Sequence, residues 1–174
     1  KHNIQIIPGR GHAIDYSTTT PWLAANARNP YPKYVAWEDF EMDGCRRDGF
    51  YNLYVSEQPA TETGERVFYE ETIKGDTINI KVEKVEYTTT EKDNVWGIGM
   101  RFKRKYTPVD GGKLTVYLNR SLADLSHRLT VMVNGKQAFS GKVQENISSM
   151  VNSCAAFGDP RRIYTAQIDV NLAN

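Results

Sequence analysis

Apolar residues recur at every second position in short stretches from residue 33 onward, and this alternation constrains the fold more than any other feature. The clearest stretches are Ile78, Ile80 and Val82; Leu114, Val116 and Leu118; and Leu129, Val131 and Val133. A period of two is typical of a β-strand with one face on a core and the other face in solvent. The alternation therefore predicts mainly antiparallel β-structure over residues 33–174.

Turn residues and further alternating stretches extend this β pattern. Strands are also expected over residues 50–55, at Ile98, Met100 and Phe102, at Phe139 and Val143, and over residues 164–172. Asn134-Gly135 follows Val133 directly and is a strong signal for a hairpin turn. Val35 and Trp37 alternate before the phase shifts to Phe40 and Met42, which predicts a β-bulge. Many short strands separated by turns indicate an antiparallel two-sheet β-sandwich.

Helix signals are few. Asn146 is a favourable N-cap, residues 147–157 are compatible with a helix, and Gly158 and Pro160 end it. A second short helix is expected over residues 18–26, with Pro21 in its first turn. The stiff run over residues 29–32 marks a boundary. We therefore divide the chain into residues 1–32, which read as strand, glycine-rich loop and short helix, and a β-sandwich over residues 33–174.

Composition and charge exclude several classes of protein. The chain has 174 residues, 40% of them apolar, with 22 Lys and Arg against 21 Asp and Glu. A net charge of +1 is too small for a protein that depends on phosphate contacts, so no nucleic-acid partner is expected. The apolar runs are too short to span a membrane. A metal site is not expected, because the histidines and cysteines are too scattered along the chain: His2, His12, His127, Cys45 and Cys154. No cofactor is expected either. The two cysteines allow one disulfide or none.

His12 is the strongest candidate for a catalytic residue. It follows an expected strand over residues 3–7 and the segment Gly9-Arg10-Gly11. A histidine on a loop at the end of a strand is suited to proton transfer near neutral pH, although a lone histidine is also a common surface residue. Gly9-Arg10-Gly11-His12 after this strand resembles the last strand and histidine loop of an α/β-hydrolase.

The residues after His12 extend the resemblance. Asp15-Tyr16, Trp22 and the run over residues 28–32 look similar to secreted bacterial esterase-like or peptidase-like hydrolases with an appended C-terminal β-domain. In that family the nucleophile and the acid precede the histidine, and this sequence contains no Gly-x-Ser-x-Gly segment. The resemblance implies that His12 is catalytic only within a longer polypeptide, because a general base without its nucleophile gives no acyl transfer. It also implies a secreted or periplasmic location and an upstream catalytic domain as partner.

Aromatic residues offer a second type of candidate site. Sandwich domains that bind sugars stack pyranose rings on exposed aromatic faces, and the candidates here are Trp37, Tyr54 and Trp96. Most such aromatic rings nevertheless belong to a core or its edge. The charged groups are interpreted as solvated strand faces. They are Glu38, Asp39, Glu41 and Asp43; Glu70 and Glu71; and residues 103–105 with Lys81 and Lys84.

Three functions remain open from the sequence. The first is a non-catalytic accessory β-sandwich that packs on or caps the catalytic domain of a secreted hydrolase. The second is a carbohydrate-binding module of a glycan-degrading protein. The third is a small stand-alone hydrolase that uses His12 with a carboxylate such as Asp15. The first is preferred, because the chain shows the histidine loop without its catalytic partners.

Overall fold

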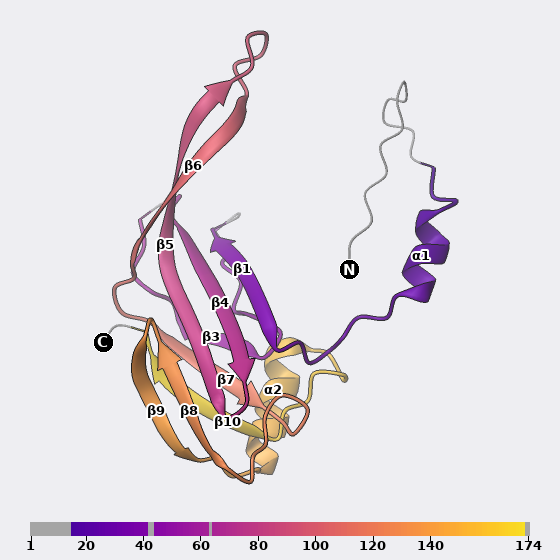
Figure 1. Ribbon diagram of the computed structural model, residues 1–174, viewed down its shortest axis with the longest axis vertical. Helices are drawn as coiled ribbons and strands as arrows, with labels where there is room; N and C mark the ends of the chain where they lie inside the picture. Colours follow the sequence, from indigo (N-terminus) through magenta and orange to yellow (C-terminus); the bar gives the residue numbers. More distant parts are fainter. Residues whose placement is uncertain (1–14, 42–43, 63, 173–174) are drawn as a thin grey trace.

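The computed structural model describes residues 15–41, 44–62 and 64–172, which form a two-sheet β-sandwich with two helices (Figure 1). The large sheet has the strand order β1-β4-β5-β8-β9, with β6 paired to β5, and the small sheet has the order β10-β7-β3-β2. The strands of the large sheet are β1 (Tyr34–Phe40), β4 (Arg66–Lys74), β5 (Thr77–Lys92), β6 (Gly99–Pro108), β8 (Arg128–Val133) and β9 (Lys136–Lys142). Those of the small sheet are β2 (Gly49–Phe50), β3 (Leu53–Glu57), β7 (Lys113–Leu118) and β10 (Ala166–Asn171).

The alternating stretches of β5, β7 and β8 supply much of the core, as the sequence predicts. Their apolar residues are all buried between the sheets: Ile78, Ile80, Val82, Leu114, Val116, Leu118, Leu129, Val131 and Val133. The hairpin at Asn134-Gly135 is confirmed, and both residues have positive φ, 49° and 82°. Asn and Gly tolerate this conformation better than other residues, which explains their place between β8 and β9.

One pair in the large sheet is parallel. Residues 77–80 of β5 run alongside residues 130–133 of β8, whereas the other paired strands are antiparallel. Between β5 and β8 the chain passes through β6 and then through β7 in the other sheet. A parallel neighbour needs such a long crossover connection. The prediction of a mainly antiparallel sandwich holds with this one exception.

The predicted bulge in the first strand is wrong. β1 pairs with β4 in one unbroken register from Tyr34↔Thr72 to Phe40↔Arg66. Asp39 therefore takes the inward position after Trp37 and is 4% exposed. Phe40 points outward, and the guanidinium carbon of Arg66 lies 4.7 Å from the centroid of the Phe40 ring. The Asp39 carboxylate accepts a hydrogen bond from the backbone N–H of Arg47 at 3.0 Å, so a polar residue occupies the inner position without a shift of register.

The predicted strand over residues 50–55 is interrupted. β2 ends at Phe50 and β3 begins at Leu53, with Tyr51 at a positive φ of 55° in the turn between them. The short β2 strand folds back on β3, pairing Gly49 with Tyr54 and Phe50 with Leu53. The chain therefore forms a tight hairpin where alternation alone indicates one continuous strand.

The second half of β5 and most of β6 leave the sandwich as a two-stranded ribbon, which we call the arm (residues 86–105). β4 pairs with β5 only as far as Arg66↔Val85, whereas β6 continues along β5 to Lys92. Figure 1 shows this hairpin projecting well beyond the rest of the molecule. Ile98, Met100 and Phe102 alternate as predicted, but they lie in the arm and are exposed.

Helix α2 (Ile147–Phe157) has the predicted bounds and caps. The Asn146 side chain accepts a hydrogen bond from the Ser149 N–H at 2.8 Å, and Gly158 ends the helix with a φ of 58°. Near its end, Phe157 meets Tyr117 of β7 edge to face, with the ring centroids 5.6 Å apart. The buried residues of α2 are Ser149 and Ser153, whereas its apolar Ile147, Met150 and Val151 are exposed.

Helix α1 (Thr19–Ala25) lies away from the sandwich and buries none of its residues (Figure 1). The connection that follows it is attached to the body. Arg28 forms an ion pair with Asp159 at 2.6 Å, and Tyr31 packs edge to face on Tyr164 with centroids 5.7 Å apart. The segment therefore joins the sandwich just after α2, and its helix has no partner among the described residues.

Candidate functional site

Among the described residues, those that the sequence singles out for chemistry do not meet in one place. His12, the expected strand over residues 3–7 and the glycines before His12 lie outside the described residues. Asp15 is exposed, and its Oδ1 accepts a hydrogen bond from the Ser17 N–H at 2.9 Å, a local turn contact that lowers the Asp15 pKa. The stand-alone hydrolase with His12 and Asp15 therefore stays a prediction.

Trp37 lies in the core. It is 8% exposed, on the inner face of β1, and its ring stacks on Tyr69 with centroids 4.5 Å apart and planes 10° apart. Phe50 packs on the same indole, 5.4 Å between centroids. Burial between the sheets removes Trp37 from any aromatic platform at the surface.

Tyr54 and Trp96 lie on different parts of the molecule. Tyr54 in β3 is half-buried and meets Phe157 of α2 edge to face at 6.4 Å. Trp96 is 80% exposed and sits in the loop at the end of the arm. Because one ring packs under α2 and the other stands at the far end of β6, the three predicted aromatic residues do not form a joint binding surface.

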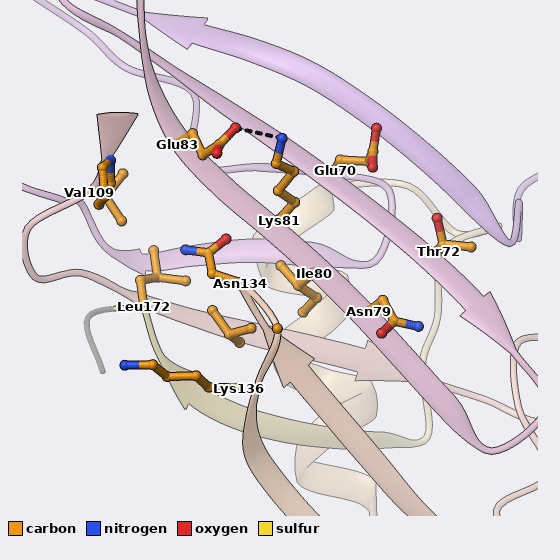
Figure 2. A pocket seen from close by; sticks show the side chains of 13 residues that line it. Glu70, Thr72, Asn79, Ile80, Lys81, Glu83, Val109, Asn134, Lys136 and Leu172 are labelled. Carbon is orange, nitrogen blue, oxygen red and sulfur yellow. Dashed lines mark ion pairs between the residues drawn. The ribbon is translucent and has the colours of Figure 1, made fainter. Parts of the chain in front are cut away.

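A hollow of about 740 Å³ lies beside β5, and we call it the β5 hollow (Figure 2). Thr72 and Glu70 of β4 and Asn79, Lys81 and Glu83 of β5 line one side of it. The turn between β8 and β9, the end of β6 and the end of β10 surround the other side. Its volume is in the range of pockets that hold small ligands.

A gap in the sheet creates the β5 hollow. Along one edge of β5, the pairing with β8 ends at Ile80↔Val133 and the pairing with β6 begins at Glu83↔Pro108. Between these points the Asn134 side chain takes the place of a strand. Its Oδ1 accepts a hydrogen bond from the Val82 N–H at 2.8 Å, and its Nδ2 donates to the Val82 carbonyl at 3.0 Å. The turn residue therefore closes the ladder and leaves a recess above it.

Charged groups of opposite sign face the β5 hollow. Lys81 Nζ lies 2.7 Å from Glu83 Oε2 and 5.2 Å from the centroid of the Tyr106 ring (Figure 2 marks the ion pair). The hydrogen bond to Glu83 raises the Lys81 pKa, so the amine stays charged at neutral pH. On β4, Glu70 accepts a hydrogen bond from the Tyr34 hydroxyl at 3.3 Å. Donors and acceptors in this arrangement can bind a polar, uncharged ligand.

Sequence reasoning missed the β5 hollow. Alternation places Asn79, Lys81 and Glu83 on the face of β5 opposite Ile78, Ile80 and Val82, and Lys81 was interpreted as part of a solvated face. That interpretation describes each side chain by itself. The recess arises from the gap between β6 and β8, which come from distant parts of the chain, so no local pattern could have located it.

Two acidic residues that were interpreted as solvated are buried. Asp39 is 4% exposed and Glu71 is fully buried. Desolvation raises the pKa of Asp39, opposed by the Arg47 N–H and by the positive charge of Arg46. Desolvation raises the pKa of Glu71 to about 8, opposed by a hydrogen bond from Asn52. The acidic residues on β1 and β4 therefore divide between the two faces of the large sheet, as strand geometry requires.

Cys45 and Cys154 are both free and exposed, so they are neither bridged nor buried apolar residues. Over residues 15–41, 44–62 and 64–172, no group of three or more His, Cys, Asp or Glu side chains is placed to hold a metal ion. Within the same ranges, no helix is long and apolar enough to cross a membrane.

Comparison with known proteins adds no relative. No family model matches the chain, and neither a curated protein nor a solved structure matches it significantly.

Proposed function

We propose that this chain is a non-catalytic accessory β-sandwich that packs on the catalytic domain of a larger secreted hydrolase. The observation that carries the proposal is the outward face of α2. Ile147, Met150 and Val151 occupy positions i, i+3 and i+4, which lie on one side of a helix, and they are 78%, 38% and 60% exposed. A helix that turns serines inward and an apolar stripe outward is suited to a second protein surface.

The N-terminal segment supports the same arrangement. α1 has seven residues, and isolated helices of that length are unstable in water. Leu23 is 60% exposed on it. The ion pair between Arg28 and Asp159 attaches the end of this segment beside the end of α2. A domain that contains residues 1–32 would therefore contact α1 and lie close to the apolar face of α2.

The proposal is tested by hydrogen exchange of the 174-residue chain and of the longer polypeptide that its reading frame encodes. We expect amides of α1 to exchange fast in the chain alone and slowly in the longer polypeptide. Ile147→Ser with Val151→Ser should restore fast exchange in α1 and release the domain without unfolding the sandwich. Lys136→Ser with Lys142→Ser on β9 is the matched control. Equal exchange of α1 in both proteins, or an upstream frame without a Gly-x-Ser-x-Gly elbow, contradicts the proposal.

A second candidate function is carbohydrate binding in the β5 hollow. The observation that favours it is the combination of an amide, carboxylates and an amine in one recess, next to the partly exposed Tyr106 ring. Calorimetry with soluble oligosaccharides tests it, with Asn79→Ala and Lys81→Ala as variants. Lys103→Ala in the arm is the control. Binding that survives both variants places the sugar elsewhere, and absence of binding to a broad oligosaccharide panel removes this candidate.

A further inference from the structure

The arm contacts the sandwich only near its base among the described residues, where the Tyr87 hydroxyl donates a hydrogen bond to Glu38 of β1 at 2.6 Å and Arg104 lies 3.9 Å from the same carboxylate. Beyond Val85, β5 has β6 on one edge and no described strand on the other, and the ribbon has no second layer. Among residues 86–105, none is buried. A two-stranded ribbon with both faces in water is only marginally stable by itself. The arm is therefore expected to become more stable when it binds to another surface.

The end of the arm is apolar. Val95 and Trp96 are 78% and 80% exposed, and Ile98 and Met100 follow at 60% and 61%. Neighbouring side chains as exposed as Val95 and Trp96 present apolar surface in more than one direction. A groove on a protein would bury only one face of such a loop, whereas a lipid layer would surround the loop and bury all of its apolar faces. The exposure in several directions therefore favours lipid.

A single carboxylate orders this loop. Asp93 Oδ1 accepts hydrogen bonds from the N–H groups of Val95 and Trp96 at 2.8 Å each, and its Oδ2 accepts one from Ile98 at 2.8 Å. The Asp93 N–H donates in return to the Ile98 carbonyl at 2.9 Å. The exposed apolar side chains are thus held on a pre-organised backbone, which reduces the entropy lost on binding.

Positive charge lies behind the apolar end. Residues 86–105 contain five basic and three acidic side chains, a net charge of +2. Glu91 is paired with Arg101 at 2.9 Å and Glu86 with Lys105 at 3.4 Å, and Asp93 is engaged by backbone N–H groups. The acidic groups therefore have partners within the arm.

The spacing of these charges fits a membrane interface. Lys92 lies opposite Gly99, and Lys103 is four residues further along β6, roughly 13 Å at the usual strand rise. Peripheral elements insert about 5–10 Å into the boundary between headgroups and acyl chains. With Trp96 at that depth, Lys92 and Arg101 lie nearest the phosphate groups, and Lys103 stands further out, where an anionic surface still attracts it.

We propose that the end of the arm inserts into the interface of an anionic lipid bilayer, with Val95, Trp96 and Ile98 entering the acyl boundary. Lys92 and Arg101 then contact lipid phosphates, and Lys103 is attracted to the anionic surface. Indole rings favour this interface, and Lys and Arg near it are attracted to anionic lipids. The attachment is peripheral and independent of the accessory role of the sandwich.

Vesicle flotation of the whole chain tests the proposal. We expect binding to phosphatidylcholine–phosphatidylglycerol vesicles to be at least about tenfold stronger than to pure phosphatidylcholine vesicles. Val95→Ser with Trp96→Ser should weaken it by about tenfold or more, and Lys103→Glu should reduce the preference for anionic lipid. The matched controls are Ile147→Ser with Val151→Ser on α2 and Lys142→Glu on β9, which leave vesicle binding unchanged.

Tryptophan fluorescence gives a second readout. Vesicles should shift the emission of the chain to shorter wavelength, and Trp96→Phe should abolish the shift while vesicle binding persists. Equal flotation of the Val95→Ser, Trp96→Ser variant and the unmodified chain overturns the proposal, as does failure to bind anionic vesicles. A dimer in light scattering that dissociates on Trp96→Ser, without vesicle binding, replaces the lipid with a second copy of the chain.

Discussion

Asn52 Nδ2 donates a hydrogen bond to Glu71 Oε1 at 2.9 Å in the interior of the sandwich, where both residues are buried. Glu71 belongs to β4 of the large sheet, and Asn52 lies in the turn before β3 of the small sheet. The bond therefore joins the two sheets. Glu71 Oε2 has no hydrogen-bond partner among the described residues, so the ionised carboxylate is poorly compensated there and the protonated form is favoured.

The first prediction concerns the pH dependence of stability. Burial raises the Glu71 pKa from 4.5 to about 8 in the folded chain. The folded state therefore holds a proton that the unfolded state has released, and the free energy of unfolding falls by about 1.4 kcal/mol per pH unit between about pH 5 and pH 8. Glu71→Gln removes this slope and stabilises the chain most at alkaline pH. Urea unfolding across this range measures the effect.

Glu70→Gln is the control for that experiment, because Glu70 is the neighbouring carboxylate on the outer face of β4. It should leave the slope between about pH 5 and pH 8 in place. A Glu71→Gln variant that keeps the full slope would show that another group causes it.

The second prediction concerns Asn134. Asn134→Ala removes two hydrogen bonds to Val82 and places an unfavourable residue at a φ of 49°, so unfolding should become easier by about 1–3 kcal/mol. Asn134→Gly accepts the same φ but lacks the side chain, which separates the two effects. Chemical denaturation measures both variants. If Asn134→Gly is as stable as the original chain, the bridge to Val82 does not stabilise the fold.

The third prediction concerns the core. Val131 is fully buried in β8, and Val131→Ala should lower the free energy of unfolding by about 1–3 kcal/mol through lost burial and the cavity left behind. Ile98→Ala in the arm is the control, with an expected change within about 0.5 kcal/mol, since Ile98 is 60% exposed. Equal effects of the two variants would contradict the assignment of their burial.

The fourth prediction concerns the thiols. Cys45 and Cys154 are free and exposed, so both should react with a thiol reagent in the folded, unreduced chain. Cys45→Ser and Cys154→Ser should each remove one equivalent of reaction and leave the melting temperature nearly unchanged. A folded chain that reacts only after reduction would indicate a disulfide.

Local sequence signals were sufficient to predict helix ends and turns, because residues close in the chain supply the hydrogen bonds and the backbone conformation that these features need. Asn146 and Gly158 bound α2 because the orphan N–H and C=O groups at helix ends are satisfied within a few residues. Asn134-Gly135 defines its hairpin for the same reason, since the turn conformation is local. His12 lies outside the described residues, so its catalytic role remains a prediction from the sequence.

The candidate site depended on distant partners. Trp37 was a candidate for a surface ring, but Tyr69 and Phe50, from other strands, enclose it. A bulge was predicted because Phe40 and Met42 are out of phase with Val35 and Trp37. The inward position goes instead to Asp39, whose carboxylate has contacts with Arg46 and Arg47. The β5 hollow likewise requires β6 and β8 to leave a gap on the same strand edge.

The sequence by itself determined which residues share a face, and the tertiary structure decided which faces are buried. Ile78, Ile80 and Val82 alternate in the same way as Ile98, Met100 and Phe102; the first set lies on β5, and the second runs from the loop just before β6 into β6. The first set faces the small sheet and is excluded from water, whereas the second set lies in the arm with no layer opposite it. A period of two follows from backbone geometry at each residue, but burial requires a second sheet within contact distance, which only the folded chain supplies.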